Sequence, residues 1–105
     1  MTNDAGTYIN GKYLPSLVEL EIRRRIHLSV YAYAYEFENI SLISDEVYDR
    51  LSRLIDVSRK TGNKRLDGFF ITQFEPHTGM WIRNHPELNK VKACYENHYK
   101  SRTTR

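Results

Sequence analysis

The sequence predicts a mainly α domain of the α+β class, in which a helical hairpin and a C-terminal helix accompany one small inserted β-hairpin. Residues 16–60 contain two segments whose apolar residues recur at spacings of three and four, as in amphipathic helices. Aromatic and β-branched residues cluster on either side of a turn within residues 69–82, and a third helical pattern covers 86–100. At 105 residues and 40% hydrophobic composition, the whole chain is expected to form a single domain.

The first helix is predicted to begin after Ser16 and to run to about residue 38. Glu19 stands three residues after Ser16, which is the arrangement of a capping box. The apolar residues that follow form one stripe: Val18, Ile22, Ile26, Val30, Tyr33 and Phe37. Tyr31 and Tyr35 lie four residues apart and therefore share a face beside this stripe.

The second helix is predicted to begin after Ser44 and to continue to about residue 60. Asp45 and Glu46 fall in its first turn, where the helix dipole favours negative charge. A stripe expected to be buried follows: Val47, Leu51, Leu54 and Ile55. Gly62 supplies the glycine that commonly ends a helix, so the two helices form an αα-hairpin.

The remaining segments are shorter. Residues 1–14 are predicted to be a polar lead-in with a short strand or turn around "TYINGKYL". The segments "FFITQF" and "GMWI" flank "EPHT" and are predicted to pair as the β-hairpin. Pro86 suits the first position of the last helix, and residues 101–105 form a basic tail.

Composition and charge narrow the class of protein. A single cysteine, Cys94, excludes an internal disulfide, and the chain shows neither a signal peptide nor a membrane-spanning apolar run, which favours the cytoplasm. Residues 1–52 carry five Lys and Arg against eight Asp and Glu, whereas residues 53–105 carry eleven against five. The basic half is compatible with a nucleic-acid or acidic partner, or with a solvated surface. The eight tyrosines favour exposed rings at a pocket or an interface.

The sequence gives little support for catalysis. Four histidines, His27, His77, His85 and His98, are scattered over different predicted elements without the spacing of a metal site. No serine or cysteine has a context typical of an activated nucleophile. We therefore predict that the protein is not an enzyme and has neither catalytic residues nor a resident metal or cofactor.

Residues 33–51, "YAYEFENISLISDEVYDRL", resemble the N-terminal Ia domain of NAD-dependent bacterial DNA ligases. In those ligases a tyrosine-rich helix, a short loop and an "I-x-D-x-x-Y-D-x-L" helix start follow one another at the same spacing. That hairpin holds the nicotinamide mononucleotide half of NAD. Small bacteriophage proteins described as ligase-related combine such a hairpin with a downstream "F-x-x-x-T-G" segment, which Phe74, Thr78 and Gly79 match here.

The resemblance implies a ligand site at the start of the second helix. Tyr35 would stack on a nicotinamide ring, and Asp45 and Asp49 would hydrogen-bond its amide or its ribose. Tyr48 would complete the wall of the pocket. Nicotinamide mononucleotide or NAD is then the expected ligand, although not a resident cofactor.

Three further residues extend this candidate site. Tyr31 shares the face of Tyr35, and Glu36 occupies a position that is a histidine in the ligases. Two helices supply only one wall, whereas a strong small-molecule site encloses most of its ligand. The ligases obtain the opposing wall from their adenylation domain; in this chain the predicted β-hairpin around Trp81 would have to fold over the helices, or a partner chain would have to close the site.

The same residues also have a purely structural interpretation. Asp45 is favoured by the helix dipole in the first turn. Tyr48 is placed to pack on Ile43 as a hydrophobic staple. Asp49 is placed to pair with Arg53 one turn further along the helix.

The chain departs from the ligases where their chemistry resides. It lacks the nucleotidyltransferase domain that carries the lysine nucleophile of a K-x-D-G motif. In "KRLDG" the nucleophile position, counted from Asp67 and Gly68, holds Arg65, and Lys64 is one residue out of register. Arginine stays protonated in proteins and cannot serve as that nucleophile.

Three functions remain open at this point. The first is a bacteriophage accessory protein that binds and inhibits a host bacterial protein, in host takeover or anti-defence. Interface hot spots are rich in Tyr, Trp and Arg, all of which this chain contains. The second is a nicotinamide-nucleotide binding module that sequesters or senses its ligand. The third is a nucleic-acid binder that uses the basic C-terminal half. None of them involves a membrane.

Overall fold

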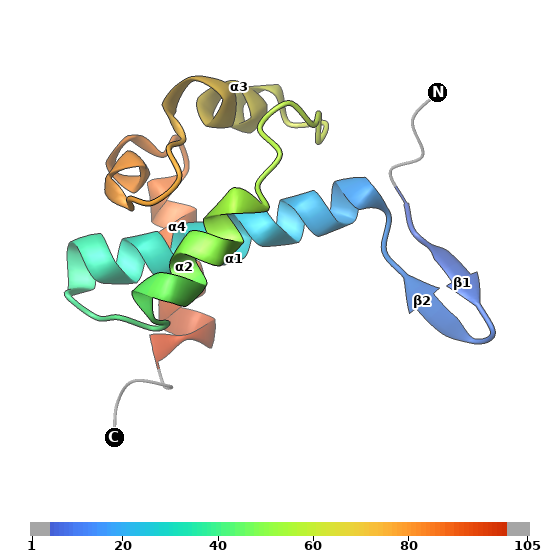
Figure 1. The fold of residues 1–105 in the computed structure, drawn as a ribbon, viewed down its shortest axis with the longest axis horizontal. Helices are drawn as coiled ribbons and strands as arrows, with labels where there is room; N and C mark the ends of the chain where they lie inside the picture. The colour runs from blue at the N-terminus through green and yellow to red at the C-terminus, as the bar shows by residue number, and fades with distance from the viewer. Residues whose placement is uncertain (1–4, 101–105) are drawn as a thin grey trace.

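The computed structural model describes residues 5–100 and shows a group of helices with a short β-hairpin projecting from one end (Figure 1). The elements in chain order are β1 Thr7–Ile9, β2 Lys12–Leu14, α1 Leu17–Glu38, α2 Asp45–Arg53, α3 Lys64–Gln73, η1 Met80–Asn84 and α4 Leu88–His98, where η1 is a 3-10 helix. The mainly α class with a small antiparallel sheet is confirmed. No helix among these residues has the length and apolarity needed to cross a membrane. The predicted basic tail, 101–105, lies outside the described residues.

Helix α1 is the axis against which α2, η1 and α4 pack (Figure 1). The predicted capping box begins it: the Glu19 N–H donates to Ser16 Oγ at 3.1 Å, and the Ser16 N–H donates to the Glu19 carboxylate at 3.0 Å. The helix ends at Asn39, whose left-handed φ of 61° turns the chain away. Both ends of α1 therefore follow from local sequence.

The short strand or turn predicted around "TYINGKYL" is an antiparallel β-hairpin. Tyr8 lies opposite Tyr13, and the turn residues Asn10 and Gly11 both have positive φ, as a type I′ turn requires. The Tyr13 hydroxyl donates to the Glu19 carboxylate at 2.6 Å, which attaches the hairpin to α1. In Figure 1 the hairpin extends away from the other helices.

The core lies where the C-terminal half of α1 meets α3, η1 and α4. Its buried members are Leu28, Val30, Ala32, Tyr33, Ala34, Phe69, Phe70, Trp81, Ile82, Val91, Tyr95 and Tyr99. The predicted stripe of α1 is only partly correct, because Ile26 and Phe37 remain 48% and 43% exposed. The last helix begins at Leu88, two residues later than its predicted start at Pro86, and buries Val91 and Tyr95.

The β-hairpin predicted over residues 69–82 is wrong. These residues form most of α3, a turn and η1. The Asn63 side chain caps α3 by accepting the Leu66 N–H at 3.1 Å, and Phe69 and Phe70 then point into the core. Burial of two consecutive phenylalanines in this helix outweighs the strand preference of aromatic and β-branched residues.

The second helix is shorter than predicted, because α2 ends at Arg53 rather than near residue 60. The Asp56 carboxylate accepts both the N–H and the hydroxyl of Ser58, a local turn that competes with helix formation. Leu54, predicted to be buried, is 49% exposed. Residues 54–63 therefore connect α2 to α3 without regular structure.

This connection is fixed by Arg25, a buried arginine in the middle of α1. Its guanidinium pairs with Glu21 at 2.8 Å and with Asp67 of α3 at 2.8 Å. It also donates to the backbone carbonyls of Asp56 at 2.9 Å and Arg59 at 3.1 Å. Such a charge tolerates burial only when its donors are satisfied, and four acceptors surround this one.

Asp67 is held as tightly as Arg25. Its carboxylate accepts the backbone N–H of Thr61 at 2.9 Å and the hydroxyl of Thr61 at 2.6 Å. Burial raises the pKa of the Asp67 carboxyl, but hydrogen bonds from Thr61 and Arg25 outweigh it and leave the pKa below its ordinary value. The aspartate of "KRLDG" therefore has a structural role. Arg65 of that segment pairs with Glu87 at 2.8 Å.

We predict that Asp67→Ala lowers the free energy of unfolding by about 3–5 kcal/mol, because it leaves the buried Arg25 with one carboxylate. Urea denaturation followed by circular dichroism measures the change. Arg23→Gln, an exposed arginine on the same helix, is the control and should alter stability by less than about 0.5 kcal/mol. Equal effects of the two substitutions would contradict the role given to Asp67.

Candidate ligand-binding cleft

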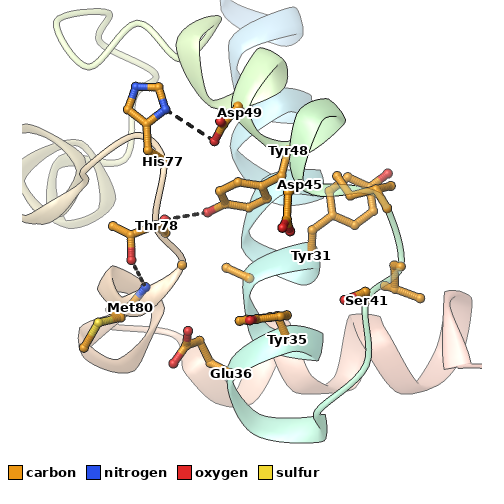
Figure 2. A pocket seen from close by; sticks show the side chains of 14 residues that line it. Tyr31, Tyr35, Glu36, Ser41, Asp45, Tyr48, Asp49, His77, Thr78 and Met80 are labelled. Atoms are coloured by element: carbon orange, nitrogen blue, oxygen red, sulfur yellow. Dashed lines mark hydrogen bonds and ion pairs between the residues drawn. The ribbon is translucent and has the colours of Figure 1, made fainter.

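A cleft of about 460 Å³ lies between α1, the start of α2 and the turn that precedes η1 (Figure 2). This volume is within the range of small-molecule sites, about 300–1,000 Å³. Six of the seven residues predicted from sequence line it: Tyr31, Tyr35, Glu36, Asp45, Tyr48 and Asp49. The sequence pattern therefore identified residues that the fold does bring together.

Helix α1 supplies the floor. Tyr31 and Tyr35 stand on successive turns, and Glu36 follows beside them (Figure 2). The Tyr35 ring is 57% exposed, and within the described part of the chain neither tyrosine hydroxyl has a hydrogen-bond partner. The exposed Tyr35 side chain is thus available to a ligand, whereas the Tyr31 ring packs against Tyr99 and His27, at 6.0 and 6.4 Å between ring centroids.

The start of α2 supplies the second set of side chains. The Ser44 side chain accepts the Val47 N–H at 3.2 Å, so the predicted helix start is confirmed. Positions i, i+3 and i+4 lie on one helical face, and Asp45, Tyr48 and Asp49 accordingly point to the same side (Figure 2). Asp49 lies 3.3 Å from His77 and does not form the predicted pair with Arg53.

Residues 77–80 form the opposing wall, as was required of the segment around Trp81. The Tyr48 hydroxyl donates to the Thr78 carbonyl at 2.8 Å, and the Trp81 indole N–H donates to the same carbonyl at 2.8 Å. Trp81 is only 4% exposed and does not line the cleft. The predicted site residue Trp81 therefore holds the wall from behind, and Phe74 packs against its ring at 5.0 Å.

Two backbone features let this wall approach α1. A Cβ atom on Gly79 would stand 3.3 Å from the Cβ of Ala32, so a side chain there would push the turn outward. His77 adopts a positive φ of 74°, and its imidazole faces Asp49 across the mouth (Figure 2). Sequence reasoning placed Thr78 and Gly79 in the "F-x-x-x-T-G" segment but did not assign His77 or Met80 to the site.

The cleft is rich in carboxylates. Glu36, Asp45 and Asp49 line it, and none of the lysines or arginines within residues 5–100 does. Glu36 is paired from outside with Arg83, at 2.9 Å from its Nη2 and 3.1 Å from its Nε, so its charge is partly compensated. Asp45 forms no hydrogen bond or ion pair with another described residue and faces the open space.

The Tyr48 hydroxyl has the most strongly shifted pKa in the cleft. Burial raises the pKa of its hydroxyl to about 12, and the charges of Glu36 and Asp49 act in the same direction. The phenol is therefore neutral at physiological pH and remains a donor to Thr78. The described residues contain no His, Cys, Asp and Glu group arranged to hold a metal ion.

A second cleft of about 320 Å³ lies between α1, α3 and α4 and is mostly apolar. None of the seven predicted site residues lines it. His85 stands at its edge, where burial lowers the pKa of the imidazole to about 4. Its Nδ1 accepts the Glu87 N–H at 3.0 Å, which holds the imidazole beside the residue that precedes α4.

Comparison of the chain with models of protein families, with curated proteins and with solved structures gives no match. The resemblance to the ligase hairpin therefore stays a prediction that rests on the residue pattern.

We predict that Tyr48→Phe lowers the free energy of unfolding at neutral pH by about 0.5–1.5 kcal/mol, because one hydrogen bond between α2 and the wall is lost. The raised pKa adds a pH dependence. The neutral phenol contributes its full stability below about pH 10, and this contribution falls as the pH rises toward 12.

Urea denaturation at several pH values tests both parts. The decline in stability between about pH 10 and pH 12 should be smaller in Tyr48→Phe than in the parent protein. Tyr33→Phe is the positive control: the pKa of Tyr33 is also about 12, so this substitution outside the cleft should reduce the alkaline decline as well. An unchanged alkaline decline in Tyr48→Phe would show that its hydroxyl is not held as described.

Proposed function

We propose that the protein is a binding module for the nicotinamide ring of nicotinamide mononucleotide or NAD. The observation that carries this proposal is the wall formed by residues 77–80. It faces the hairpin side chains named by the ligase resemblance and encloses a cleft of about 460 Å³. A single helical hairpin lacks such enclosure, whereas tight small-molecule sites bury most of the ligand.

The arrangement of side chains supports specific roles. The exposed face of Tyr35 offers a surface on which a flat ring stacks, and Tyr31 lines the cleft one turn away. Asp45 and Asp49 present carboxylate oxygens that accept hydrogen bonds from an amide N–H₂ or from ribose hydroxyls. Tyr48 is engaged with Thr78 and acts as a rigid wall.

In this proposal the protein binds its ligand and catalyses no reaction on it. The lysine nucleophile position of the ligases is Arg65 here, and its guanidinium pairs with Glu87. Asp67 is engaged by Arg25 and Thr61. Because the segment that resembles a catalytic motif is occupied by structural contacts, we assign the protein to sequestration or sensing of the ligand.

We predict micromolar binding of nicotinamide mononucleotide and NAD by isothermal titration calorimetry. Tyr35→Ala should weaken it by about 5- to 100-fold, because stacking of a base on an aromatic ring is worth about 1–3 kcal/mol. Asp49→Asn should weaken it by about tenfold or more, because a charged hydrogen-bond acceptor is lost.

Two matched controls separate loss of the site from loss of the fold. Glu46→Gln changes an exposed acid on the same helix outside the cleft, and Tyr8→Ala removes an exposed tyrosine on the distant β-hairpin. Both should bind as the parent does. The proposal fails if the parent protein gives no heat at millimolar concentration with nicotinamide mononucleotide, NAD or nicotinamide riboside.

A second candidate function is binding of a protein, and the N-terminal β-hairpin favours it. Tyr8 is 75% exposed, Ile9 53%, Leu14 47% and the adjacent Leu17 62%. Neighbouring exposed apolar side chains of this size are typical of interaction surfaces. A bacterial host protein, bound and inhibited in host takeover or anti-defence, is the partner expected from the sequence. The nucleic-acid alternative gains no comparable support, since Arg65 and Arg83 are paired with acids.

We predict that Ile9→Ser combined with Leu17→Ser abolishes capture of a bacterial protein by the immobilised chain, because it removes exposed apolar area from the contact. Asp49→Asn, which changes only the cleft, should leave capture intact. Quantitative mass spectrometry of the captured proteins measures the difference. A protein retained equally by the parent and the hairpin variant would place the interface elsewhere.

A further inference from the structure

The cleft carries an excess of negative charge, which disfavours a ligand that carries phosphate. Three carboxylates line the cleft, while His77 is the only side chain able to carry a positive charge among the described residues of its lining. His77 already faces Asp49 at 3.3 Å, and Arg83 reaches Glu36 from outside the lining. Like charges a few ångströms apart in a partly enclosed site repel strongly.

The start of α2 gives a phosphate no alternative contact. Helix N-termini commonly bind anions through their free backbone N–H groups. Here the Ser44 side chain accepts the Val47 N–H, and Asp45 and Glu46 place two negative charges in the first turn. The side chains of this helix therefore occupy the position that a phosphate would need.

The same surroundings favour a positively charged ring. Tyr35 offers an exposed ring face at the floor, and a cation over such a face is attracted by the quadrupole of the ring. Asp45, which has no partner among the described residues, points into the same space and adds attraction for a cation. A pyridinium ring is flat, aromatic and cationic, and so it meets both features at once.

We infer that the cleft selects an N-substituted pyridinium nucleoside without phosphate over the corresponding nucleotide. Nicotinamide riboside is the probe that represents this class. The inference rests on the proposed function and names the ligand class of the same site: the ring and the sugar are recognised, while a 5′-phosphate is repelled by the carboxylates.

Calorimetric titration of the full chain with three compounds tests the inference. Nicotinamide riboside should bind at least ten times more tightly than nicotinamide mononucleotide. It should also bind at least ten times more tightly than reduced nicotinamide riboside, whose ring is neutral. Raising the ionic strength from about 0.05 M to about 0.5 M should narrow the gap between riboside and mononucleotide, because salt screens the repulsion.

One substitution and one control test whether the cleft carboxylates cause the preference for the riboside. Asp45→Asn removes a cleft carboxylate without changing its shape and should reduce the ratio of the two affinities at least threefold. Glu46→Gln removes the neighbouring charge, which lies outside the cleft, and should leave the ratio unchanged. An equal reduction in both variants would attribute the preference to net charge and overturn the inference.

The outcomes distinguish this inference from the function on which it rests. Mononucleotide binding as tight as riboside binding overturns the phosphate-free class and leaves the nicotinamide site in place. Equal affinity for the oxidised and reduced ribosides overturns the selection of a cationic ring. Absence of binding by all three compounds at millimolar concentration overturns the proposed function together with the inference.

Discussion

The buried guanidinium of Arg25 is the constraint on which the rest of the structure depends. A charge so enclosed is tolerated only when every donor finds an acceptor, and the acceptors come from α1, the 54–63 connection and α3. The irregular connection therefore stays close to α1 although it contains no helix or strand. Asp67 in turn fixes the start of α3 through Thr61. The Arg25 side chain thus fixes the position of the segment that leads into α3.

The position of the cleft wall follows from this anchoring of α3. With α3 anchored at Asp67, Phe70 and Phe74 of its C-terminal end reach Trp81, at ring distances of 5.6 and 5.0 Å. Trp81 then holds the Thr78 carbonyl, to which Tyr48 donates from the other side. Because the wall is supported by a packed aromatic cluster and two hydrogen bonds, the cleft has a defined shape before any ligand arrives. Such preorganisation reduces the entropic cost of binding.

The sequence predicts those parts of the molecule that depend on neighbours along the chain. The capping box at Ser16 and the shared face of Asp45 and Asp49 follow from spacings within one helical turn. The position of α3 cannot be predicted in this way, because the polar residue Asp67 lies on the buried side of the helix and interrupts its apolar periodicity. The wall is equally hidden, since it depends on contacts between residues about thirty positions apart, such as Tyr48 and Thr78. Long-range pairing of this kind leaves no local signal.

Two surfaces with different chemistry lie toward opposite ends of α1. The cleft is polar and acidic at the C-terminal half of the helix, whereas the β-hairpin at its N-terminal end exposes apolar side chains. Between them stands the rigid node at Arg25, and the hairpin is attached to α1 by the contact of Tyr13 with Glu19. Energetic coupling needs an element with two arrangements that both sites bias. A capped helix of 22 residues that carries a buried ion-pair network offers no such element. Ligand binding in the cleft and any contact made by the hairpin are therefore expected to be energetically independent.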